Sequence, residues 1–282
     1  MMRLTSLLVL AAAFLSGCTS GILRKPDGYQ IKKVAIVSIY ANHGVYNLKG
    51  GGGLTEGLST LGSLIGNDKM KEVIPTDFGG DHLIRYSLKA YETELAKVNG
   101  WEVVPTTEVV KSAAYQKYTE RMEKYGRTMA SLQKFGNAMW KTPKGMVPYT
   151  GGHADDSSPD FKELQTLAQE LNVDAVAVVK LDFAYTPHNA IGSSVAGNFG
   201  GTGTAKASVA SSLKFVSKDG KIAVLTPEVT KGAGQRHVSD ETCILMAGNI
   251  NFGDKEKQMY MQAIDRTAQA WYQQITTELA KR

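Results

Sequence analysis

The sequence has few cysteines and no long apolar run. Its two cysteines, Cys18 and Cys243, exclude the disulfide-rich class of small secreted proteins. The apolar run over residues 4–15 is shorter than the roughly 20 residues that a membrane-spanning helix needs. Hydrophobic residues make up 43% of the 282 residues, which is enough to bury a core. The composition is therefore that of an ordinary globular protein.

The beginning of the chain has the features of an export signal. Arg3 is its only charged residue, an apolar run follows, and small residues then lead into a cysteine. The motif formed by these last residues resembles the lipobox of bacterial lipoproteins, and it consists of Leu15, Ser16, Gly17 and Cys18. The alternative interpretation is a buried cysteine that follows an apolar helix.

The lipobox resemblance implies a cellular location as well as a lipid modification. It implies that residues 1–17 are removed and that Cys18 carries three acyl chains, which anchor the protein firmly in a membrane. Thr19, in place of an aspartate after the cysteine, implies the periplasmic face of the outer membrane. Cys243 then has no partner for an intramolecular disulfide.

The charge balance favours some partners and excludes another. The net charge is +5 and the pI is about 9.0, but the lysines are interspersed with acidic residues, as in 69–72. Export from the cytoplasm argues against nucleic acid as a partner of such a chain. We therefore expect a membrane contact through the lipid anchor, and a protein partner or a homo-oligomer in the envelope.

The pattern of apolar residues predicts one α/β domain after a short tether. We expect a signal peptide at 1–17, a lipidated tether at 18–30 and a single domain at 31–282, with inserts near 42–77 and 126–158. Buried or alternating runs predict strands at 33–40, 101–105, 174–185, 204–216 and 222–225. Helical spacing predicts helices at 81–98, 106–125, 159–171 and 255–282.

Three stretches carry a resemblance to a known group of proteins. They are the opening strand Val34-Ala35-Ile36-Val37, the helix and strand at 167–178, and the hairpin at 212–221. These stretches resemble the TolB amino-terminal domain and its relatives, which include the curli secretion channel. The resemblance implies a mixed central sheet with packed helices. In the curli channel relatives it also implies oligomers that insert hairpins into the outer membrane. The two inserts match no member of that group, and fold alone does not give function.

The sequence shows no catalytic, cofactor or metal site. The glycines at 50–53 lack the Gly-Lys-Ser/Thr ending of a phosphate-binding loop. His153, Asp155 and Asp156 have no further ligand at a regular spacing, so we expect an exposed turn there. The other histidines are dispersed, and no serine lies in a Gly-x-Ser-x-Gly elbow.

We therefore expect a non-catalytic outer-membrane lipoprotein that binds or assembles within a cell-envelope complex. The first alternative is an oligomeric secretion or transport protein with a membrane-inserting hairpin, for which the strand at 204–216 is long enough. The third hypothesis is a cell-wall hydrolase that uses His153 or Asp155.

Overall fold

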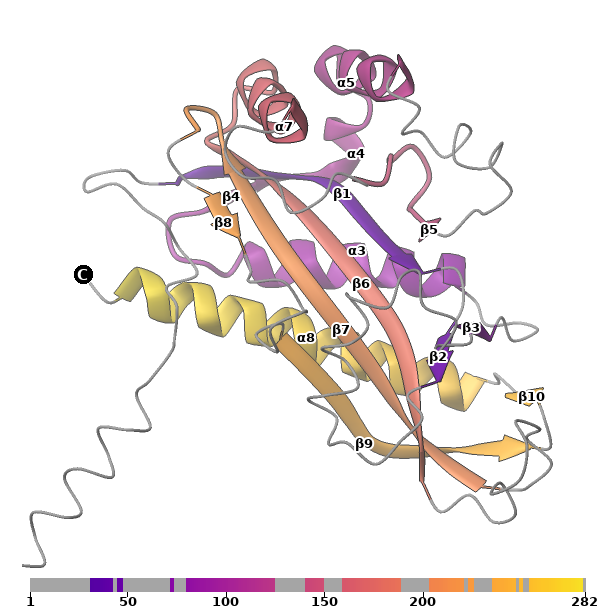
Figure 1. Ribbon diagram of the computed structural model, residues 1–282. Coiled ribbons are helices and arrows are strands. Elements are labelled where there is room, and N and C mark those ends of the chain that lie inside the picture. Colours follow the sequence, from indigo (N-terminus) through magenta and orange to yellow (C-terminus); the bar gives the residue numbers. More distant parts are fainter. Residues whose placement is uncertain are drawn as a thin grey trace, which may run out of the picture.

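The computed structural model describes residues 31–42, 45–47, 72–73, 80–124, 140–149, 159–188, 203–220, 223–225, 235–246, 249–250 and 254–280. These residues form an α/β fold, as the sequence predicts. One mixed sheet runs through the molecule, and helices pack on both of its faces (Figure 1). No helix in these stretches is both long and apolar enough to cross a membrane.

The sheet has a parallel part and an antiparallel part. Its order is β10-β9-β7-β6-β1-β4. The strands are β1 (Lys33–Asn42), β4 (Glu102–Val104), β6 (Ala175–His188), β7 (Gly203–Ser217), β9 (Gln235–Met246) and β10 (Asn249–Ile250). Strand β1 is parallel to β4 and β6, whereas β7, β9 and β10 continue the sheet in antiparallel fashion. The apolar strands β1 and β6 are buried on both faces, as nearly continuous apolar runs predict.

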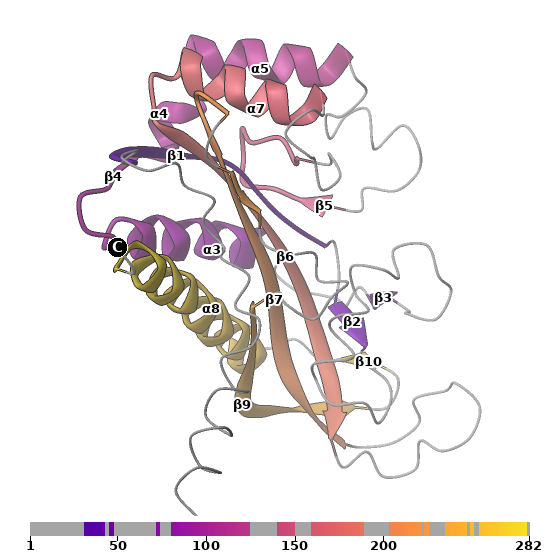
Figure 2. The same ribbon diagram turned by 60° about the vertical axis from the view of Figure 1, so that its left-hand side comes forward.

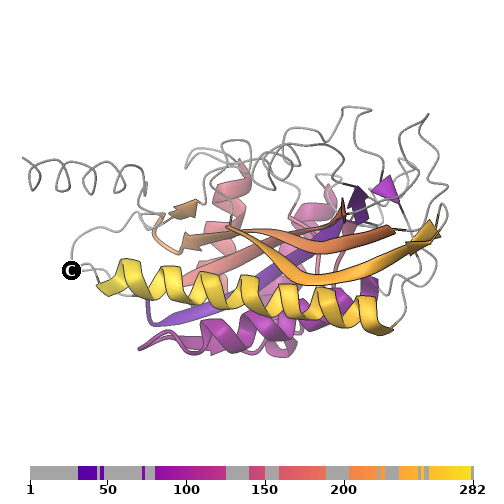
Figure 3. The same cartoon turned by 90° about the horizontal axis from the view of Figure 1, so that it is seen from below.

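Two helical layers cover the sheet. The first consists of α3 (Gly80–Leu95) and α8 (Asp254–Ala280), which lie against each other along one face (Figure 3). The second consists of α4 (Thr106–Val109), α5 (Ala113–Lys124) and α7 (Pro159–Glu170) on the opposite face (Figure 2). Each layer buries the apolar side of its helices on the sheet, so the molecule has one core on each face of the sheet.

One polar residue of β7, Ser211, lies among the apolar residues that face the core under α3 and α8. Ala207, Val209, Leu213 and Phe215 enter this core, but Ser211 stands in the same alternation. The Trp271 side chain of α8 donates its indole N–H to the Ser211 hydroxyl at 2.8 Å, and both groups are buried. Ser211 therefore provides the acceptor that a buried tryptophan needs.

Strand β1 contains one residue more than the facing part of β6. Its pairing passes from Ile36 to Ser38, so that Val37 has no partner in the register. The Tyr115 hydroxyl donates to the Val37 carbonyl at 2.8 Å. Because such a bulge shifts the alternation of side chains, Tyr40 points into the core under α5 and α7 rather than into the other one.

Several elements differ from the sequence prediction. The helix expected at 106–125 is split into α4 and α5, because the Ser112 hydroxyl accepts the Tyr115 N–H and starts a new helix. Helix α3 spans Gly80–Leu95, so that it ends before the predicted end at residue 98, and Asp81 lies in its first turn. The sequence analysis missed β9 and β10, and also the short strands β2 (Val45–Asn47), β3 (Glu72–Val73) and β5 (Trp140–Lys141).

The predicted hairpin after β7 is present. Strand β8 (Ala223–Leu225) pairs antiparallel with β7 at Lys214 to Val216. Gly220 in the turn has φ +69°, a backbone conformation that residues with a Cβ rarely adopt. This turn lies in the hairpin that the sequence predicts at 212–221.

Candidate functional site

The residues that the sequence singled out lie mostly outside the described part of the chain. This holds for Cys18, Leu15, Ser16 and Gly17 of the lipobox, for the glycines at 50–53, and for His153, Asp155 and Asp156. Of the other histidines, His82 lies on α3, His188 ends β6 and His237 lies in β9. Within the described stretches, no group of three His, Cys, Asp or Glu side chains is placed to hold a metal ion.

The structure instead brings together a group of charged and aromatic side chains on the sheet face that α5 and α7 cover. We call this group the lysine–aromatic cluster. Its members are Tyr40 of β1, Trp140 of β5, Tyr149, Lys180 and Asp182 of β6, and Lys214 of β7. None of them was proposed as a functional residue from the sequence.

The cluster begins where the apolar part of this sheet face ends. Along β6 the side chains on this face pass from Val176 and Val178, which pack in the core under α7, to Lys180 and Asp182. Along β7 they pass from the buried Val216 to Lys214. Charged residues thus replace apolar ones at successive levels of two neighbouring strands, because Lys214 pairs with Val178 and Lys180 pairs with Ser212.

The strand register fixes which members of the cluster are neighbours. Lys180 pairs with Tyr40 of β1 on one side and with Ser212 of β7 on the other. Lys214 pairs with Val178, so that it lies diagonally across the β6–β7 ladder from Lys180. Long side chains at such diagonal positions are within reach of one another.

The segment 140–149 places an aromatic ring against each lysine. The Lys180 ammonium lies 5.0 Å from the centroid of the Trp140 ring, and the Lys214 ammonium lies 4.8 Å from that of Tyr149. Trp140 also meets Tyr40 edge to face, with ring centroids 5.3 Å apart. Cation–π contacts of this kind are stronger when the cation is partly desolvated.

Hydrogen bonds hold this segment on β1. The Ser38 hydroxyl donates to the Val147 carbonyl at 2.9 Å and accepts the Tyr149 N–H at 3.0 Å. The Tyr115 hydroxyl accepts the Val147 N–H at 3.1 Å while it donates to the bulge in β1. The bulge, helix α5 and the segment 140–149 are therefore connected through buried polar groups.

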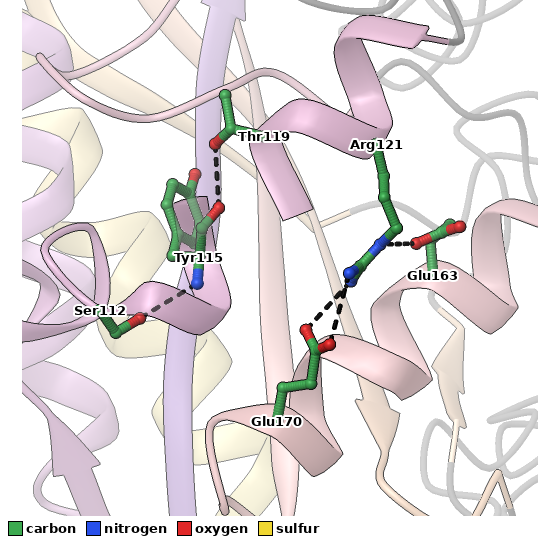
Figure 4. Close-up of polar contacts among 6 residues, drawn as sticks. All are labelled: Ser112, Tyr115, Thr119, Arg121, Glu163 and Glu170. Atoms are coloured by element: carbon green, nitrogen blue, oxygen red, sulfur yellow. Dashed lines mark hydrogen bonds and ion pairs between the residues drawn. The ribbon is translucent and has the colours of Figure 1, made fainter. Parts of the chain in front are cut away.

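An ion-pair network joins α5, which carries Tyr115, to α7. The Arg121 Nε donates to Glu163 at 2.6 Å, and its Nη2 donates to Glu170 at 3.1 Å (Figure 4). Burial opposes the charge of Arg121, but the hydrogen bonds that it donates to Glu170 and Glu163 outweigh this effect and raise its pKa. Pairs of this kind are among the stronger hydrogen bonds of proteins, so they fix the helix that supports the cluster.

The charges of the cluster are not balanced among the described residues. The Lys180 ammonium lies 3.4 Å from the Asp182 carboxylate, which is almost completely buried. Lys214 contacts the Tyr149 ring but forms no ion pair with any described residue. Burial lowers the pKa of Lys214 to about 8, so the amine is still mostly protonated at neutral pH.

The cluster offers more hydrogen-bond donors than acceptors. Burial, together with the nearby Asp182 and Tyr149, raises the pKa of Tyr40 far above its usual value, so its hydroxyl keeps its proton. Two ammonium groups and the hydroxyl of Tyr40 stand beside a single carboxylate. Such a set of groups suits a bound anion, because ammonium groups donate and cannot accept hydrogen bonds.

A second set of charged residues, centred on Asp174, binds the backbone at the start of the domain. The Asp174 carboxylate accepts the N–H groups of Lys32 and Lys33, each at 2.9 Å, and the Lys218 ammonium at 2.9 Å. Burial opposes ionisation, but these hydrogen bonds outweigh it and lower the pKa of Asp174. This aspartate precedes β6 in one of the stretches that carry the predicted resemblance, and its contacts are structural.

Comparisons with known proteins add no identification. The chain matches no family model, no curated protein and no solved structure. The resemblance to the TolB amino-terminal domain and the curli secretion channel therefore stays a prediction from the sequence.

Proposed function

We propose that the chain is a non-catalytic lipoprotein on the periplasmic face of the outer membrane, anchored through Cys18, that binds or assembles with protein in an envelope complex. The observation that carries the proposal is the outer edge of β9, which is mostly unpaired among the described residues. On that side, Leu245 and Met246 pair with the two-residue strand β10, and no other described strand pairs with β9.

A long edge strand has a physical consequence. Its unpaired N–H and C=O groups form a template on which a strand from another chain can add. Strand β9 has 12 residues and is paired with β7 on its inner side, so it is held in an extended conformation. The opposite edge of the sheet, at β4, has only three residues and therefore offers far fewer backbone groups for pairing.

The proposal can be tested on the lipidated protein extracted in a mild detergent. We expect it to copurify with a defined partner or to elute as a homo-oligomer, and a Cys18→Ala variant to lose the membrane fraction. A strict monomer that forms no crosslinks in intact cells would contradict the proposal.

The second candidate is an oligomeric secretion protein with a membrane-inserting hairpin. The observation in its favour is the β6–β7 ladder, which is continuous from Ala175 to His188. On one face of β6, however, the side chains from Ala175 to Phe183 pack in the core under α3 and α8. Strand β6 ends at His188, and spanning a bilayer takes about 9–11 residues per strand, so insertion would have to draw residues of this core into the membrane.

Conductance in planar bilayers distinguishes the two candidates. A pore predicts discrete conductance steps and an oligomer in detergent. A binding component predicts no conductance with or without its partner.

A further inference from the structure

We propose that the lysine–aromatic cluster binds a singly charged phosphate group between the ammonium groups of Lys180 and Lys214. The inference rests on the cluster itself and does not depend on which protein pairs with β9. It assigns a ligand site to a face of the sheet where the sequence predicts none.

The first argument is the charge of the cluster. Two lysines face one carboxylate, because Asp182 lies beside Lys180 and no described acidic residue pairs with Lys214. Charged groups that leave water are generally paired, since an unpaired buried charge is costly. One further negative charge, such as that of a phosphodiester or of dihydrogen phosphate, makes the cluster neutral.

The second argument is that the Lys214 side chain is held in place. Its strand is paired at this level with β6 on one side and with β8 on the other. Its ammonium lies over the Tyr149 ring, and the Tyr149 N–H is bonded to Ser38. Burial keeps part of the side chain out of water and lowers its pKa, so the charge is not compensated by full hydration. The site is thus preorganised for an anion.

The third argument is the geometry of the other donors. Tyr40 and Ser212 flank Lys180 in the register, and each carries a hydroxyl group. Donors therefore come from three adjacent strands, which suits the oxygens of a tetrahedral phosphate better than a planar carboxylate. Lysines are common phosphate ligands, and they act there as point charges.

The aromatic rings do not favour a sugar as the ligand. One face of Trp140 is occupied by the Lys180 ammonium, and its ring meets Tyr40 at 90°. One face of the Tyr149 ring is likewise occupied by Lys214. These rings hold the cations in position.

The test uses the full-length chain in a neutral, phosphate-free detergent. Calorimetric titrations with inorganic phosphate, with dimethyl phosphate and with acetate measure the affinity of each anion. We expect saturable binding of a phosphate form, and Lys214→Met and Lys180→Met should each weaken it about tenfold or more. The matched control is Lys89→Met, because Lys89 is exposed on α3; it should leave the affinity unchanged.

The two phosphate probes also identify the source of the ligand. Tighter binding of dimethyl phosphate indicates a phospholipid headgroup, and tighter binding of inorganic phosphate indicates the free ion. Acetate that binds as tightly as either, no saturable binding, or phosphate binding that survives both lysine substitutions would overturn the proposal. Thermal unfolding of each variant is measured alongside the titrations. If one variant has a folding defect, the other variant still tests the proposal.

Discussion

Replacing Lys214 by methionine is expected to stabilise the protein at neutral pH. In the folded protein, burial lowers the pKa of Lys214 from 10.5 to about 8. One pKa unit corresponds to about 1.4 kcal/mol, so keeping this amine charged at pH 7 costs the folded state about 3 kcal/mol. Two effects reduce the gain in stability that methionine brings. Part of the Lys214 side chain reaches solvent, and the variant loses the contact between the ammonium and the Tyr149 ring, which is worth about 0.5–1 kcal/mol. The expected net gain is about 1–3 kcal/mol.

The pH dependence of stability distinguishes this effect from a change in packing, which would not vary with pH. Between pH 8 and pH 10.5 the unfolded chain holds the proton of Lys214 and the folded protein has released it. The unfolded state then binds more protons, so the stability of the wild type rises with pH in this window. From pH 7 to pH 9.5 the wild type should gain about 2 kcal/mol relative to Lys214→Met.

Urea unfolding in a phosphate-free buffer at the two pH values measures this difference. Groups that titrate in both proteins cancel in the comparison, and the exposed Lys89→Met variant should follow the wild type at both pH values. A Lys214→Met protein that is less stable at pH 7 by more than about 1 kcal/mol, or that shows the same pH slope as the wild type, would refute the reasoning.

Three further predictions follow from side-chain hydrogen bonds. Asp174→Asn should destabilise the protein by about 1–3 kcal/mol at pH 7; because the folded pKa of Asp174 is lowered, this difference should shrink as urea unfolding is repeated at pH values falling through that pKa. Trp271→Phe should cost about 1–3 kcal/mol, since it leaves the buried Ser211 hydroxyl without its donor; adding Ser211→Ala should recover part of this loss, and additive losses in the double-mutant cycle would contradict the bond. Tyr115→Phe should speed hydrogen exchange at the Val147 and Tyr149 amides while exchange in α3 stays unchanged; equal exchange in both proteins would show that Tyr115 does not hold the segment 140–149.

The elements with strong local periodicity were predictable from the sequence. Strands β1 and β6 contain nearly continuous apolar runs, and α3, α7 and α8 repeat apolar residues at helical spacing. Their local pattern agrees with their burial on the sheet. The serine at the start of α5 was also a signal, because Ser112 precedes the helix at the N-cap position.

Strand β9 was not predictable in the same way. The first half of Gln235–Met246 is mostly polar, and its apolar residues gather at the end, so it shows neither alternation nor a buried run. It pairs with β7 through its backbone, with a shift of register between Lys206 and Ser208. Such pairing depends on a neighbour distant in the chain, which local patterns do not report.

The candidate site was visible only in part. The alternation along β7 places Lys214 opposite the apolar residues, and the sequence shows this. The rings of Trp140 and Tyr149, however, come from a segment that hydrogen bonds attach to the bulge in β1. The position of that bulge and of that segment follows from tertiary contacts, so the cluster appears only in the folded chain.

Photo-crosslinking along β9 tests the central claim most directly. A photoreactive residue is placed at Val238 or Thr242 of the lipidated protein in intact cells, and at the exposed Lys89 of α3 as a control. A binding or assembly component predicts one discrete crosslinked species, to a partner or to a second copy, from the β9 positions and none from Lys89. The absence of any product from β9, or the same products from Lys89, would contradict the account.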